Sequence, residues 1–239
     1  MAGRDIVEAS GLSEDAEAEV RHRCGYGCIR CGVTVYHYAV LPIPDEPDWE
    51  APATVLLCPE CYALLRRHPL SAEQYGLLLR RPVLRDPDFY RQHLPFGSVL
   101  PQMRAGGPVP VHDVSVPVLA GDQAPLILSL PASGVGALRI SLFLSGPDHV
   151  LRRVVDANHW APEEEGWHFA HRESRYVVES DRSDARAELD FTAPGRLTVV
   201  RLRTWIGEVL IDLTPDWLEV DGTRMTGVIA SRQLAGYRL

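Results

Sequence analysis

The amino-acid sequence predicts an α+β protein, in which a small cysteine-rich module with flanking helices precedes a larger all-β domain. Three observations predict this arrangement. All five cysteines lie between positions 24 and 61, residues 94–108 are rich in proline and glycine, and nearly every later segment has the composition of a strand. We therefore expect the module over residues 1–93, a linker over 94–108 and the β-rich domain over 109–239.

Two matched cysteine pairs organise the first module. Cys28 and Cys31 form one Cys-x-x-Cys pair, and Cys58 and Cys61 form the second after 26 intervening residues. Each pair places two thiolates on one tight turn, and four thiolates complete a tetrahedral shell around Zn²⁺. The spacing predicts a structural zinc site with these four ligands, since a redox pair or buried free thiols would not explain two matched pairs. The fifth cysteine, Cys24, we interpret as a small buried residue.

Charge and hydropathy restrict the partners and the compartment. The formal net charge is −8, and all 24 basic residues are arginine against 32 acidic residues. Affinity for phosphate comes largely from cationic contacts, so the net charge argues against nucleic acid as a partner. The first residues contain no apolar run, and no stretch approaches the roughly 20 apolar residues that span a bilayer, so we expect neither a signal peptide nor a membrane span. We expect a reduced, cytoplasmic protein that does not enter a membrane.

Local patterns predict the elements of the first module. Ser13 followed by an acidic run predicts a capped helix over residues 14–23. The β-branched and aromatic segment 33–42 predicts a hairpin or one bent strand. We expect a helix to begin at Tyr62, after the second cysteine pair, and Ser71-Ala72-Glu73-Gln74 resembles a capping box that opens another helix.

The chain beyond the linker alternates as strands do. In residues 138–144 the even-numbered positions are apolar, and they share one face of the expected strand. Turn residues separate about nine or ten such segments. A sandwich is the favoured architecture, with a β-helix or a stacked prism as the alternatives. The segments are 109–116, 126–130, 138–144, 150–155, 175–179, 187–191, 197–203, 208–213 and 217–220.

The module resembles a known family. Arg21-x-Arg23-Cys24-Gly25-Tyr26-Gly27-Cys28-x-x-Cys31-Gly32, the aromatic strand after it and Leu56-Leu57-Cys58-Pro59-x-Cys61 are similar to the zinc-stapled HNH (His-Me finger) endonuclease fold. The resemblance covers about residues 12–70. It implies a β-hairpin and a helix held by a four-cysteine zinc. It also implies a strand histidine that activates water and further His or Asn ligands for a catalytic metal.

The catalytic positions of that family are not filled here. The catalytic pair should fall within residues 38–40, where the chain has no acid and no histidine. The nearest histidine is His37, and a shift of one residue turns a strand side chain to the opposite face, so His37 could substitute only on a bulged strand. Tyr62 stands where a ligand histidine is expected, and Trp49 or Ala53 stands at the loop ligand position. The resemblance therefore implies a retained structural zinc and a lost catalytic metal.

A second candidate cluster lies in the β-rich domain. Residues 156–171 contain His159, His168 and His171 together with Trp160 and Trp167. The histidine spacing matches no ligand pattern, and we interpret the stretch as aromatic packing beside a solvated acidic loop. Exposed tryptophans would instead indicate a protein-binding or carbohydrate-binding surface.

These observations favour a non-catalytic, zinc-stabilised recognition or assembly protein. Its β-rich domain would bind a protein partner or further copies of the chain. The alternative is an HNH-type, metal-dependent DNA endonuclease with a rearranged site that uses His37 and an acidic loop residue, Asp45 or Asp48. A third possibility is a domain that reads nucleic-acid sequence without cutting, against which the net acidity argues.

Overall fold

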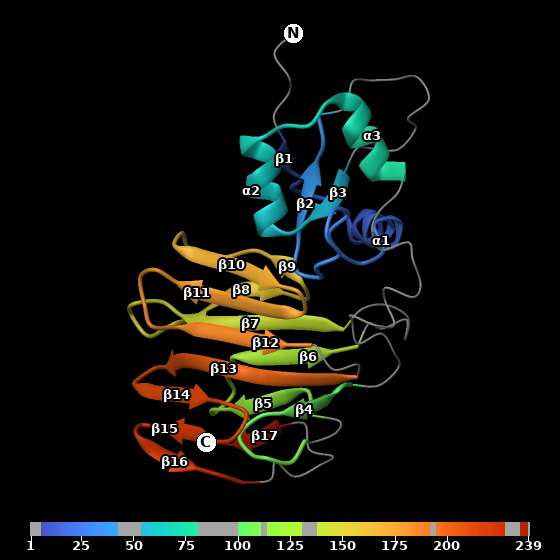
Figure 1. Ribbon diagram of the computed structural model, residues 1–239. Helices are drawn as coiled ribbons and strands as arrows, with labels where there is room; N and C mark the ends of the chain where they lie inside the picture. The colour runs from blue at the N-terminus through green and yellow to red at the C-terminus, as the bar shows by residue number, and fades with distance from the viewer. Residues whose placement is uncertain are drawn as a thin grey trace. The chain divides into compact units, whose positions relative to one another are not determined.

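A computed structural model describes residues 6–42, 54–80, 100–110, 114–130, 138–191, 195–227 and 235–238. The chain divides into two compact units, residues 1–89 and residues 90–239 (Figure 1). Within the described residues the first unit contains three helices and three strands, and the second contains strands only. The fold is therefore mostly β.

The first unit is built on a three-stranded antiparallel sheet in the order β1-β2-β3. Its strands are β1 (Val7–Glu8), β2 (His37–Val40) and β3 (Thr54–Leu57), and its helices are α1 (Glu14–Arg23), α2 (Pro59–Arg67) and α3 (Ala72–Arg80). Every residue of β3 is buried. The register of β2 on β3 runs from His37 opposite Leu57 to Val40 opposite Thr54 without a bulge.

Helix α1 has the bounds and the cap that the sequence predicts. The Ala16 amide donates a hydrogen bond to the Ser13 hydroxyl at 3.3 Å, which satisfies one amide of the first turn. At the other end, the Arg21 guanidinium donates to the Tyr38 hydroxyl at 2.6 Å and to the Glu17 carboxylate at 3.0 Å. The bond to Tyr38 joins α1 to β2, whereas the bond to Glu17 lies within the helix.

The next two helices confirm one prediction and correct another. Helix α2 begins at Pro59, inside the second cysteine pair, and not at Tyr62 as predicted. The amides of the first helical turn have no acceptor within the helix, so proline, which lacks an amide hydrogen, loses no hydrogen bond there. Cys58 serves as the N-cap. The capping box of α3 is confirmed, since Ser71 and Gln74 each accept a hydrogen bond from the other's backbone amide, at 3.2 and 2.9 Å.

The second unit contains fourteen strands among its described residues, more than the sequence predicts. Strands β10 to β16 form an antiparallel meander that β4 joins, β6 to β9 form a second sheet, and β5 pairs with β17 in parallel. The strands are β4 (Gln102–Arg104), β5 (Val116–Leu119), β6 (Leu126–Ser129), β7 (Arg139–Ser145), β8 (Leu151–Asp156), β9 (His159–Trp160), β10 (Trp167–Arg172), β11 (Arg175–Ser180), β12 (Arg186–Asp190), β13 (Arg196–Ile206), β14 (Val209–Leu213), β15 (Leu218–Val220), β16 (Thr223–Met225) and β17 (Ala235–Arg238).

The two larger sheets of the second unit face each other. Residues alternate between buried and more accessible positions along β7 and β13, so each sheet has one core face. The Ser145 amide donates to the Thr204 hydroxyl at 2.8 Å, and the Trp205 amide donates to the Ser145 hydroxyl at 3.0 Å. These bonds join the end of β7 to β13. Each of the two sheets therefore buries one face against the core of the unit.

The predicted linker needs a correction. Strand β4 lies inside residues 94–108 and pairs in parallel with Arg196–Thr198 at the start of β13. Met103, the central residue of β4, is fully buried. The described part of the predicted linker, residues 100–108, therefore belongs to the second unit.

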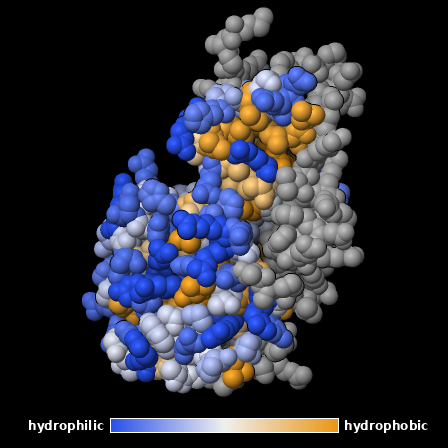
Figure 2. All heavy atoms as spheres, in the orientation of Figure 1, coloured by the Kyte–Doolittle hydropathy of each residue, from blue (hydrophilic) through white to orange (hydrophobic). Residues whose placement is uncertain are grey.

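Cross-strand ion pairs cover the outer face of the meander. The buried carboxylate of Asp212 accepts from the guanidinium groups of Arg201 and Arg203, each at 2.7 Å. Figure 2 shows hydrophilic residues over much of the visible face of this unit. Opposite charges on neighbouring strands stabilise their pairing and keep the face in water.

Replacing Asp212 by alanine should lower the free energy of unfolding by about 1–3 kcal/mol, because two guanidinium groups lose a shared acceptor. The matched control is Asp216→Ala, whose carboxylate is 63% exposed and pairs with Arg104 at 2.6 Å. An exposed pair contributes about 0–1 kcal/mol. Urea unfolding followed by tryptophan fluorescence gives the free energy of unfolding of both variants. An equal loss in the two variants would contradict the role of Asp212 as an acceptor shared by two guanidinium groups.

Candidate metal centre

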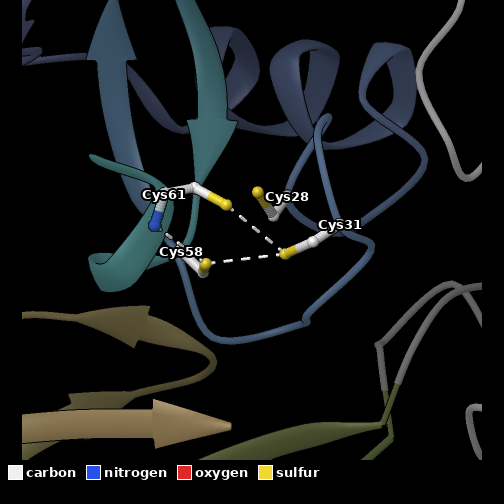
Figure 3. Close-up of side chains that lie close together, drawn as sticks. All are labelled: Cys28, Cys31, Cys58 and Cys61. Carbon is white, nitrogen blue, oxygen red and sulfur yellow. Dashed lines mark hydrogen bonds between the residues drawn. The ribbon is translucent and has the colours of Figure 1, made fainter. Parts of the chain in front are cut away.

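Four cysteine sulfurs converge in the first unit. The Sγ atoms of Cys28, Cys31, Cys58 and Cys61 all lie within 4.8 Å of one another. Cys31 Sγ lies 3.6 Å from Cys58 Sγ and 3.7 Å from Cys61 Sγ (Figure 3). The structure thus brings together the four ligands that the sequence predicts.

The spacing of the sulfurs fits a tetrahedral metal. Zinc–sulfur bonds of about 2.3 Å separate neighbouring sulfurs of a tetrahedron by about 3.8 Å. The distances from Cys31 Sγ to Cys58 Sγ and to Cys61 Sγ, 3.6 and 3.7 Å, lie close to that value. A disulfide needs sulfurs about 2.05 Å apart, so these thiols are not paired covalently. The donor set can hold one tetrahedral ion.

Local backbone geometry shapes both cysteine pairs. In the first pair the Gly32 amide donates to the Cys28 carbonyl at 2.8 Å, and Gly32 has a φ of 83°, which glycine adopts without strain. The second pair occupies the N-terminus of α2, where the Cys61 amide donates to Cys58 Sγ at 3.4 Å. The amides of a helix N-terminus favour negative charge, so this position stabilises thiolates.

The four thiols shift one another's pKa values. Burial raises the pKa of Cys28, but hydrogen bonds from the other three thiols lower this pKa well below its ordinary value. The hydrogen bond to Cys28 in turn raises the pKa of Cys58. Thiolates this close repel one another, which opposes full ionisation of the cluster. A divalent ion would allow all four sulfurs to bind as thiolates.

Arg30 adds a positive charge that the sequence analysis did not assign. Its guanidinium lies 3.9 Å from Cys61 Sγ. Four thiolates around a divalent ion carry a net charge of −2, and a neighbouring guanidinium offsets part of it. The sequence signal that could have identified Arg30 was its position between the two cysteines of the first pair.

Cys24 lies outside the cluster. It is 1% exposed, and its sulfur accepts the Leu56 amide at 3.4 Å. The interpretation of Cys24 as a small buried residue is confirmed.

His37 lies between an acid and an aromatic ring. Its side chain is 12% exposed, and Nδ1 lies 3.5 Å from the Glu8 carboxylate. Its ring centroid is 4.9 Å from that of Tyr62. His37 could take the catalytic position of the HNH fold only if a bulge in β2 turned its side chain to the opposite face. The pairing of β2 with β3 contains no such bulge. The loop candidates Asp45, Asp48, Trp49 and Ala53 lie outside the described residues.

His159, His168 and His171 do not converge. His168 is 61% exposed and lies 3.4 Å from Asp181. Trp160 and Trp167 are buried, and Trp160 packs edge-on against Phe169 at 5.8 Å. Aromatic packing is therefore confirmed for this stretch. In the part of the chain that the structure describes, the four cysteines are the one group of three or more potential ligands that lies close enough to hold an ion.

Comparisons with known protein families, with curated proteins and with solved structures found no match to this chain. Among the described residues, no helix is both long enough and apolar enough to cross a membrane.

Proposed function

We propose that the first unit is a zinc-stapled structural module and that the protein acts in recognition or assembly without catalysis. The convergence of four cysteine sulfurs at the spacing of a tetrahedral tetrathiolate is the observation that carries this proposal. All four positions of the shell are occupied by protein sulfur, which is typical of structural sites. A catalytic zinc keeps one position for water.

The order of elements supports a scaffold of the HNH type. The first cysteine pair precedes β2, β3 follows, and the second pair opens α2, as in the hairpin and helix that the resemblance implies. Tyr62 stands on α2 where that family needs a ligand histidine, and its ring packs against His37. We therefore propose that the scaffold is kept and that the chemistry is lost.

Cobalt substitution tests the proposed site. Co²⁺ takes the same tetrahedral sulfur ligands, and its absorption spectrum distinguishes thiolate ligands from oxygen ligands. We expect the full-length protein to show the spectrum of a tetrahedral tetrathiolate, and Zn²⁺ to displace the cobalt. An octahedral, oxygen-type spectrum would contradict a four-cysteine site, and an intense visible colour as purified would indicate iron in place of zinc.

The second unit is the proposed partner-binding or self-associating part. In the described residues β10 pairs only with β11, and β16 pairs only with β15, so the eight-stranded sheet ends in two edge strands. Edge strands are templates for pairing with another chain. Sedimentation of the full-length protein should give a mass of at least two chains. A monomer at every concentration would contradict self-association.

The alternative function is a metal-dependent DNA endonuclease. The pairing of His37 with Glu8 favours it, because a carboxylate beside a histidine orients the ring for general-base catalysis. The test is plasmid cleavage by the full-length protein in Mg²⁺ or Mn²⁺. We expect none. Cleavage that His37→Ala abolishes would overturn the scaffold proposal.

A further inference from the structure

Cys31 differs from the other three sulfur ligands in its access to solvent. Cys28 and Cys58 are fully buried and Cys61 is 6% exposed, whereas Cys31 is only partly buried. In Figure 3 Cys31 reaches from the loop of the first pair toward the second pair. Oxidation of cysteine follows thiolate character and exposure. In a zinc tetrathiolate all four sulfurs are thiolates, so exposure decides which one an oxidant reaches first.

Two sulfurs lie close enough to Cys31 to form a disulfide with it once it is oxidised. Cys58 Sγ lies 3.6 Å away and Cys61 Sγ lies 3.7 Å away, both in the second pair. A disulfide of about 2.05 Å requires either sulfur to approach by about 1.5 Å. The Arg30 guanidinium lies 3.9 Å from Cys61 Sγ, and a positive charge there favours the thiolate form of Cys61.

We propose that Cys31 is an oxidation site through which hydrogen peroxide releases the metal, an inference that rests on the proposed zinc centre. The Cys31 thiolate attacks one peroxide oxygen. The S–O bond forms, the O–O bond breaks and hydroxide leaves, so sulfur is oxidised by two electrons and the peroxide is reduced. The thiolate of Cys58 or Cys61 then attacks Cys31 Sγ, which forms the disulfide and expels a second hydroxide.

Loss of two thiolates opens the metal shell. Zinc held by the remaining two sulfurs dissociates, and the free energy that it contributes to folding of the unit is lost. A dithiol reverses the step by thiol–disulfide exchange and restores the ligands. The centre thus couples the oxidation state of Cys31 to the folded state of the first unit.

The test treats the zinc-loaded, full-length protein with increasing hydrogen peroxide. Zinc release is followed with a chromophoric chelator, sulfenic acid is trapped with dimedone, and disulfides are mapped on non-reduced peptides. We expect the first dimedone adduct on Cys31, a disulfide from Cys31 to Cys58 or Cys61, and release of zinc in proportion to that disulfide. A first adduct on Cys28 or a disulfide without Cys31 would overturn the proposal.

Two matched variants sharpen the result. Cys31→His and Cys28→His both keep a Cys₃His shell, which is a common structural zinc site. Peroxide should release zinc at least about threefold more slowly from Cys31→His than from Cys28→His, which keeps the Cys31 thiolate. Equal rates in the two variants would contradict the assignment. If either variant fails to hold zinc, the dimedone labelling of the wild type decides alone.

The outcomes separate the two proposals. A wild-type protein that binds no zinc before oxidant is added contradicts the proposed metal centre. A protein that holds zinc but loses it without modification of Cys31 contradicts only the oxidation site.

Discussion

Replacing Cys58 by serine is expected to unfold the first unit and to leave the second unit folded. Cys58 supplies one sulfur and also caps α2, so the variant loses a metal ligand and weakens the start of the helix that carries Cys61. Structural zinc contributes about 10–16 kcal/mol of binding free energy in small modules, which exceeds the stability of most domains. Hydrogen exchange should show residues 24–67 close to unfolded rates, with the strands of the second unit still protected.

Cys24→Ser is the matched control for this experiment. Cys24 is equally buried but lies outside the sulfur cluster. Its replacement should cost about 1–2 kcal/mol and keep the metal. Protection of residues 24–67 in Cys58→Ser at the wild-type level would show that the cysteines do not hold this unit together.

Replacing Met103 by alanine should lower the free energy of unfolding of the second unit by about 2–5 kcal/mol. Met103 is fully buried on β4, and truncating a buried side chain of this size leaves a cavity beside β13. The measurement is urea unfolding followed by tryptophan fluorescence, because four of the five tryptophans follow residue 100.

Gln102→Ala controls for the strand itself. Gln102 lies next to Met103 on β4 but is only partly buried, so its replacement should change the stability by less than about 1 kcal/mol. If Met103→Ala is no more destabilising than Gln102→Ala, residues 102–104 act as the linker that the sequence predicts.

Strong local signals account for what the sequence predicted correctly. Helix α1 follows from Ser13 and the acidic first turn, and β7 follows from the alternation over residues 138–144. The cluster of four cysteines follows from two spacings that place sulfur on turns. In each case the residues that form the pattern are close in sequence, so the pattern can be recognised without knowledge of the fold.

The missed elements depend on partners far away in the chain. Strand β4 is three residues long between Pro101 and a glycine pair, and it becomes a strand only by pairing with residues 196–198. Its context has the composition of a linker, and tertiary pairing outweighs that local preference. Strand β10 had a usable signal, because Trp167 and Phe169 are buried while His168 between them is exposed. Its aromatic residues suggested a cluster rather than an alternating strand.

The sequence predicted the four cysteines of the site but not the contacts of the residues around them. The unbulged register of β2, the contact of His37 with Glu8, and the place of Arg30 beside Cys61 all arise from the packing of separate segments. Spacing within a motif predicts which residues bind, whereas the contacts that tune them depend on how separate segments pack.

Metal analysis of the full-length protein tests the central claim most directly. Protein purified without chelators should contain about one zinc per chain by elemental mass spectrometry, and Cys58→Ser purified in parallel should contain essentially none. Wild-type protein without stoichiometric metal, or zinc retained in full by the variant, would contradict a metal centre built from these four cysteines.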